Sequence, residues 1–155
     1  MLNITIIGHG FVGKAVDYAF QYDVKKLIID PKYNKKESYS DINSDITFIC
    51  VPTPMSKNGT CNTYILESIL NKLKNIECGI IVIKSTIPPD ILKNLNNLKI
   101  VYNPEFLTEK NANEDIINPS IQVLGGQKEI TQKVEQYYKE YSICKPCPTF
   151  HMSLT

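Results

Sequence analysis

ITIIGHGFVG, residues 4–13, is the stretch that decides the fold of this 155-residue chain. The apolar run Ile4–Ile7 leads directly into Gly8, Gly10 and Gly13, and an amphipathic segment follows. Glycine permits a tight turn at the first position, leaves bare backbone for a phosphate at the second, and allows close helix packing at the third. The stretch therefore predicts a strand, a phosphate-binding turn and a helix.

The residues around this turn indicate which dinucleotide it holds. The start of the predicted helix, Phe11 and Val12, directs free N–H groups and the positive end of the helix dipole at phosphates. Asp30 ends the next β-branched run, where a carboxylate accepts hydrogen bonds from the adenosine ribose and repels a 2′-phosphate. We therefore expect NAD rather than NADP. His9, inside the turn, is expected to face solvent. Three lysines near Asp30 weaken the discrimination against NADP: Lys32, Lys35 and Lys36.

Short β-branched runs alternate with helix-length amphipathic segments along the whole chain. The predicted strands are Ile4–Ile7, Leu27–Asp30, Ile46–Val51, Ile80–Ile83, Lys99–Tyr102 and Ile121–Leu124. The predicted helices begin near Phe11, Tyr64, Pro89 and Glu129, and residues 31–45 are expected to be loop with at most a short helix. We therefore expect an α/β fold of the Rossmann type: a doubly wound, mainly parallel sheet of about six strands with helices on both faces.

The composition is that of a single globular domain. The chain has 17 basic and 16 acidic side chains and a net charge of +1, which gives no reason to expect a nucleic-acid or membrane partner. Its apolar runs are shorter than the roughly 20 residues that cross a bilayer. Met1 leads directly into a strand-like run without the features of a secretory signal, and five irregularly spaced cysteines suit a reducing compartment. We expect a cytoplasmic location.

Cys144 and Cys147 form the one C-x-x-C pair, with the sequence CKPC. This spacing suits a redox pair or half of a zinc site. However, Pro148 follows at once, and a second pair that would complete a zinc site is absent from the sequence. We favour two cysteines on a terminal strand or loop, and we expect no metal site.

Three further motifs each supply the loop just beyond the carboxyl end of a predicted strand: FICVPTP at Phe48–Pro54, KSTIPP at Lys84–Pro89, and NPEFL at Asn103–Leu107, followed by Glu109. Ligands bind at this edge of an open α/β sheet. In this order behind GHGFVG, the motifs resemble those of the UDP-glucose/GDP-mannose dehydrogenase family. The resemblance extends from about residue 2 to about residue 124 or beyond.

Members of that family oxidise the C6 alcohol of a nucleotide sugar to a carboxylate, reducing two NAD per sugar through a covalent thioester. The resemblance implies a nucleotide-sugar partner, with UDP-glucose as the default substrate and with GDP-mannose and UDP-N-acetylhexosamines as alternatives that these residues do not separate. It also implies cofactor contacts in three places: Val51, Pro52, Thr53 and Pro54; Ser85 and Thr86 on the nicotinamide side; and Lys35 near the adenosine end.

The resemblance implies that the NPEFL segment binds the substrate. Glu105 would help to activate the water that hydrolyses the thioester, and Glu109 would contact cofactor and substrate. The main chain of Glu105, Phe106, Leu107, Thr108 and Glu109 would hold the nucleotide sugar. A carboxylate within hydrogen-bond reach can serve as the required base. The alternative is that the two glutamates are a solvated pair near the start of a helix.

The sequence departs from the family pattern in two local places. Lys110 stands where the family usually has glycine, and Pro119-Ser120-Ile121 lacks the arginine of the family's PxR segment. The family's nucleophilic cysteine lies in a glycine-rich segment of a C-terminal domain, and its oxyanion-stabilising lysine and asparagine lie on a central helix. No segment of residues 1–155 matches these features. We therefore interpret residues 1–155 as a single NAD-binding domain that does not turn over substrate alone.

Other readings remain open at this point. The chain is either cut from a longer protein or naturally short, and it either pairs with a C-terminal half, forms a homo-oligomer or is monomeric. One alternative is a hydroxyacid or 6-phosphogluconate-type dehydrogenase that shares only the first βαβ unit. Another is a stand-alone nucleotide-binding or regulatory module, or one subunit of a split dehydrogenase.

Overall fold

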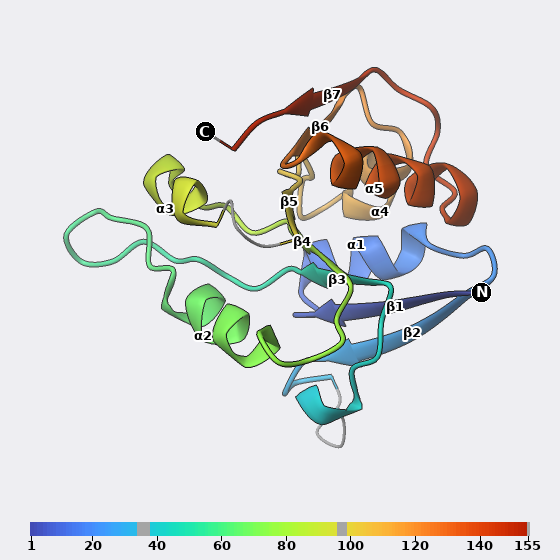
Figure 1. Cartoon of the computed structure of the whole chain (residues 1–155). Coiled ribbons are helices and arrows are strands. Elements are labelled where there is room, and N and C mark those ends of the chain that lie inside the picture. Colours follow the sequence, from blue (N-terminus) through green and yellow to red (C-terminus); the bar gives the residue numbers. More distant parts are fainter. Residues whose placement is uncertain (34–37, 96–98, 155) are drawn as a thin grey trace.

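The computed structural model describes residues 1–33, 38–95 and 99–154 and contains a seven-stranded sheet in the order β2-β1-β3-β4-β5-β6-β7 (Figure 1). The strands are β1 (Leu2–Ile7), β2 (Val24–Ile29), β3 (Ile46–Ile49), β4 (Ile80–Ile83), β5 (Ile100–Tyr102), β6 (Gln122–Gly125) and β7 (Thr149–Met152). The helices are α1 (Phe11–Ala19), α2 (Tyr64–Leu73), α3 (Pro89–Asn94), α4 (Ala112–Ile117) and α5 (Lys128–Tyr141), with a 3-10 turn at Tyr39–Asp41.

Helices cover both faces of the sheet. Helices α1, α4 and α5 lie on one face, and α2 and α3 lie on the other (Figure 1). Phe20, Phe48 and Tyr138 form the aromatic centre of the first core, with ring centroids 5.1–6.2 Å apart. All four residues of β3 and of β4 are buried, as expected for strands covered on both sides.

The strand order sets the position of the binding crevice. The chain runs from β1 outward to β2 and then returns to β3 on the other side of β1. The loops after β1 and β3 therefore leave in different directions, and a crevice opens at the carboxyl ends of these strands. Strands β1 to β5 are parallel, whereas β6 runs antiparallel to β5 through the pair Tyr102 and Gly125 and is parallel to β7.

The predicted Rossmann-type fold is confirmed, with two elements that the sequence analysis missed. The sheet has seven strands rather than six, because β7 was not predicted. This strand follows a proline-rich segment and lies at the edge of the sheet, where its residues alternate between half-buried and exposed. Helix α4 was also missed, since its six residues are too few to show a helical period and, unlike the equally short α3, it has no proline to mark its start. Strand β2 begins at Val24 rather than Leu27, because the edge strand tolerates the lysine pair that precedes Leu27.

A buried polar group connects four of these elements. Asn103, directly after β5, accepts hydrogen bonds at Oδ1 from Lys84 Nζ and from the Tyr138 hydroxyl, each at 2.8 Å. Its own amide donates to the carbonyl of Val123 in β6 at 2.9 Å. Lys84 is only 6% exposed, and burial lowers its pKa. Asn103 therefore supplies acceptors that buried polar groups need.

We predict that Asn103→Ala destabilises the fold by about 2–4 kcal/mol, because it leaves the Tyr138 hydroxyl without an acceptor and Lys84 with only a backbone oxygen at 3.4 Å. Tyr138→Phe removes one neutral hydrogen bond and is expected to cost about 1 kcal/mol. Urea unfolding followed by circular dichroism measures both. Equal losses in the two variants would contradict the central role of Asn103.

Candidate functional site

The three glycines of the GHGFVG turn have different surroundings. Gly8 has a φ of +92°, and a Cβ there would lie 2.7 Å from the carbonyl oxygen of Cys50. A Cβ on Gly13 would lie 1.9 Å from the carbonyl oxygen of Gly8. By contrast, a Cβ on Gly10 would have no heavy atom within 4 Å. The first and third glycines are therefore required by the fold, whereas the second faces open space of the kind that a pyrophosphate needs.

The first turn of α1 adds donors to this open space. Gly10 is the N-cap and provides no side-chain cap. The first hydrogen bond of the helix runs from the Lys14 N–H to the Gly10 carbonyl. The N–H groups of Phe11, Val12 and Gly13 therefore have no acceptor within the helix. Together with the helix dipole they form an environment that favours a phosphate, so the turn fits a dinucleotide.

Asp30 directly follows β2 and lies against the turn. Its carboxylate accepts the backbone N–H of His9 at 2.7 Å and that of Lys32 at 2.8 Å. Burial pushes the pKa of Asp30 upward, but these two hydrogen bonds, together with weaker contributions from His9 and the Tyr33 backbone, outweigh it and the pKa lies below its ordinary value. Asp30 is thus an anion at neutral pH, as discrimination against a 2′-phosphate requires.

The expectation that His9 faces solvent was wrong. Its side chain is 7% exposed, and Nε2 lies 3.1 Å from Asp17 Oδ2 on α1. Asp17 in turn pairs with Lys26 of β2 at 2.9 Å. The ring also packs on Tyr33, with the centroids 4.2 Å apart. The His9 side chain therefore contacts Asp17 on α1 and Tyr33 in the segment after β2 instead of water.

A small cavity of about 150 Å³ lies where the loops after β3 and β4 meet the start of α1. Ser85 Oγ donates to the carbonyl of Val51, and Thr53 Oγ1 donates to that of Thr86, each at 2.7 Å, which ties the VPTP and KSTIPP loops together. The lining of this small cavity includes six residues predicted to contact the cofactor: Val12, Val51, Pro52, Thr53, Ser85 and Thr86. Cys50, Lys84 and Glu105 complete the lining.

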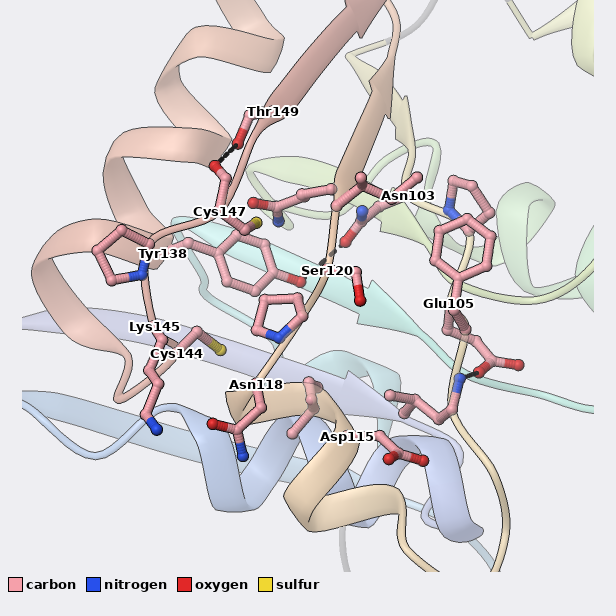
Figure 2. Close-up of a pocket in the computed structure, with 18 of the residues that line it drawn as sticks. Asn103, Glu105, Asp115, Asn118, Ser120, Tyr138, Cys144, Lys145, Cys147 and Thr149 are labelled. Carbon is pink, nitrogen blue, oxygen red and sulfur yellow. Dashed lines mark hydrogen bonds between the residues drawn. The ribbon is translucent and has the colours of Figure 1, made fainter.

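A larger cavity of about 810 Å³ opens between the NPEFL loop, α4, β6 and α5 (Figure 2). Of the predicted substrate residues, it is lined by Glu105, Phe106 and Leu107. Glu105 Oε2 accepts the backbone N–H of Leu107 at 2.6 Å. Glu105 and Lys84 line both cavities, so they stand between the two spaces. Lys84 was missed as a site residue because its position between the cavities depends on contacts between separate loops.

Eight of the described residues predicted to form the site line neither cavity: Gly8, Gly10, Phe11, Gly13 and Asp30 at the phosphate turn, and Pro54, Thr108 and Glu109. Thr108 instead donates from its N–H and its hydroxyl to Asp115 on α4. Lys35 lies outside the described residues. Pro119-Ser120-Ile121, where the family's arginine was expected, forms part of the wall of the larger cavity.

Four of the described cysteines, Cys50, Cys78, Cys144 and Cys147, are poor nucleophiles. Burial raises the pKa of Cys50 to about 12 and also raises the pKa of Cys78, Cys144 and Cys147, so these four thiols stay protonated at neutral pH. Cys144 and Cys147 lie in the loop between α5 and β7, as expected, and are free. Within residues 1–33, 38–95 and 99–154, no cluster of three or more His, Cys, Asp or Glu side chains is suited to a metal ion. No helix in the same ranges has the length and hydrophobicity needed to cross a membrane.

Sequence comparison supports the motif-based prediction. The NAD binding domain of the UDP-glucose/GDP-mannose dehydrogenase family matches residues 24–142. The UDP-glucose 6-dehydrogenase of Campylobacter jejuni is 29% identical over 90% of this chain and 36% of its own length. Across the curated relatives it matches, the chain spans about a fifth to two fifths of their length, 21% to 39%. The family match removes the hydroxyacid or 6-phosphogluconate-type alternative.

Solved structures show the same fold. A ternary complex of GDP-mannose dehydrogenase from Pseudomonas aeruginosa superimposes with a TM-score of 0.78 at 20% identity, covering 97% of this chain and 46% of that one. A UDP-glucose dehydrogenase from Pyrobaculum islandicum gives 0.79 at 21% identity, covering 99% and 46%. With the phosphate turn and Asp30, these findings show that the chain belongs to the UDP-glucose/GDP-mannose dehydrogenase family and carries its NAD-binding domain.

Proposed function

We propose that this chain is the cofactor-binding part of a nucleotide-sugar dehydrogenase, which oxidises the C6 alcohol of the sugar, by default UDP-glucose, to a carboxylate. The observation that carries the proposal is the position of Glu105 between the two cavities. One cavity gathers residues expected to contact the cofactor, and the other is bordered by the segment expected to hold the sugar nucleotide. A hydride transfer between the two ligands requires them to meet at such a boundary.

On the cofactor side, the glycine turn and the first turn of α1 bind the pyrophosphate, and Asp30 accepts hydrogen bonds from the adenosine ribose. The VPTP and KSTIPP loops, fixed to each other by the Ser85 and Thr53 hydroxyls, orient the nicotinamide end. NAD, when bound, supplies the hydride acceptor. The residues of this chain hold and orient it.

On the substrate side, Glu105 is the base that takes a proton from the water attacking the thioester. Its Oε2 is held by the Leu107 N–H, which fixes the carboxylate and leaves Oε1 as the proton acceptor. The nucleophilic thiol is none of Cys50, Cys78, Cys144 and Cys147, because their raised pKa values keep them protonated at neutral pH.

Two differences from the family pattern favour a second candidate, a stand-alone nucleotide-binding module or one subunit of a split enzyme. The Pro119-Ser120-Ile121 segment, which lacks the family's arginine, borders the larger cavity. Lys110 also stands where the family usually has glycine, the residue that lets a backbone approach a ligand most closely. Both differences weaken the predicted contacts to the nucleotide sugar and leave the predicted contacts to the cofactor intact.

The first prediction from the proposed function separates an effect on cofactor binding from an effect on the stability of the fold. Gly10 has a φ of −74° and a ψ of −160° and open space around it, so Gly10→Ala should fold normally. Its methyl group occupies the pyrophosphate space and should lower NAD affinity by roughly 5- to 150-fold, equivalent to about 1–3 kcal/mol. Calorimetric titration with NAD and thermal unfolding provide the two readouts.

Gly13→Ala is the matched comparison. Its Cβ would collide with the Gly8 carbonyl, so this variant should lose stability as well as NAD affinity. If Gly10→Ala binds NAD as well as the wild type, the pyrophosphate does not lie at this turn.

The second prediction concerns Asp30. Asp30→Asn removes the negative charge, so NAD affinity should fall by roughly tenfold while NADP affinity is unchanged or increases. Asp23→Asn is the matched control, because Asp23 precedes β2 at the opposite end of the sheet and pairs with the N-terminal ammonium. Parallel titrations with NAD and NADP measure the ratio, and an unchanged ratio would contradict the role of Asp30.

The third prediction tests the substrate side. UDP-glucose added to the NAD-loaded chain should slow amide hydrogen exchange at residues 105–109, and glucose 6-phosphate, which lacks the nucleotide, should not. The chain alone should form no NADH with UDP-glucose. Unchanged exchange with normal NAD binding would favour the stand-alone module, and NADH formation would show that the chain is a complete catalyst.

A further inference from the structure

Tyr33 is an exposed aromatic side chain beside the residue that binds the adenosine ribose. Its backbone N–H donates to the carbonyl of Asp30 at 3.0 Å, which closes a turn and fixes Tyr33 three residues after the carboxylate. The neighbouring N–H of Lys32 donates to the Asp30 carboxylate itself at 2.8 Å. The main chain that presents Tyr33 is therefore the same turn that orients Asp30.

The ring of Tyr33 rests on a buried histidine. His9 and Tyr33 have centroids 4.2 Å apart and an interplanar angle of 48°. His9 is in turn held by Asp17 on α1, and Asp17 by Lys26 on β2. The His9 Nδ1 atom is buried and has no hydrogen-bond partner among the described residues, so the His9 ring is held by its Nε2 contact with Asp17 and by packing.

This arrangement differs from that of an ordinary surface tyrosine. Tyr33 is 56% exposed, so much of its surface is available to a ligand while His9 supports the ring. A ring that is already fixed loses little conformational entropy when a ligand stacks on it. Stacking of a nucleobase on an aromatic side chain is favourable for every base, because each has a π-face.

We propose that Tyr33 forms a wall of the adenosine site and stacks on the adenine of NAD, and that His9 is the positioning residue that holds the Tyr33 ring. The inference rests on the assignment of NAD as the cofactor. A ribose bound to Asp30 carries the adenine on the adjacent carbon, C1′, within reach of a side chain from the same turn. Tyr33 thus contributes affinity for the adenosine half, independently of the nicotinamide end.

The experiment measures binding of NAD and of ADP-ribose, which lacks the nicotinamide, by calorimetric titration. Tyr33→Ala should weaken both ligands by the same factor, about 5- to 100-fold, and Tyr33→Phe should retain wild-type affinity. Tyr22→Ala is the matched control, because Tyr22 is also 56% exposed but lies between α1 and β2 at the opposite end of the sheet. Nuclear Overhauser effects between the adenine protons and the Tyr33 ring are expected in the wild type.

A double-mutant cycle tests the positioning role of His9. His9→Ala should weaken NAD binding in the wild-type background and have no further effect in the Tyr33→Ala background, because His9 acts through Tyr33. A residue with a merely structural role would give additive losses. If His9→Ala unfolds, His9→Gln replaces it, since glutamine can still donate to Asp17 but provides no ring for Tyr33.

Two results would overturn the proposal. One is wild-type affinity of Tyr33→Ala for both ligands, and the other is a set of adenine contacts that does not include the Tyr33 ring. Additive losses in the cycle would overturn the role of His9 alone. These outcomes do not depend on the nucleotide sugar. Failure of UDP-glucose to bind would count against the proposed substrate, whereas it would leave the adenosine site unaffected.

Discussion

The close approach of α1 to β1 is the constraint on which the cofactor side depends. At Gly13 the helix lies so near the Gly8 carbonyl that a single methyl group would not fit. Gly8 in turn lies against the Cys50 carbonyl after β3. These contacts bring the start of the helix to the crevice between β1 and β3, where its dipole and free N–H groups have a ligand to bind.

The proposed substrate side depends on a different arrangement. Asn103 joins Lys84 after β4, Tyr138 on α5 and Val123 in β6. The chain continues from Asn103 through Pro104 to Glu105, so the residue that anchors the loop is two positions from the proposed base. Lys84 precedes Ser85, whose hydroxyl fixes the VPTP loop. The polar group that stabilises the core therefore also sets the relative positions of the two loops.

Local patterns in the sequence were sufficient for much of this structure. The GHGFVG turn, Asp30 and the fully apolar strands each depend on residues within one βα unit, and they predicted the Rossmann-type sheet. Six of the predicted cofactor residues gather around one cavity, since the carboxyl ends of neighbouring parallel strands meet at one edge.

What the sequence did not predict depends on long-range contacts or on short elements. His9 is buried only because Asp17 and Tyr33 fold around it. Lys84 becomes a shared wall of two cavities only after β4 and β5 pair. Helix α4 and strand β7 are short and lack the local signals of equally short elements that were predicted: α4 has no proline start like that of α3, and β7 has no continuous β-branched run like that of β4. The family resemblance supplied the proposed role of Glu105, which spacing alone could not give.

The antiparallel junction between β5 and β6 has a consequence for how the domain responds to a ligand. These strands meet through a single residue pair, Tyr102 and Gly125, whereas β6 and β7 pair along their whole length. The larger cavity has walls on both sides of this junction. A molecule that fills the larger cavity contacts both the β6–β7 pair and the remaining sheet. Its binding should therefore raise the free energy needed to open the β5–β6 junction locally. The rigidity of the β6–β7 edge then depends on the ligand concentration.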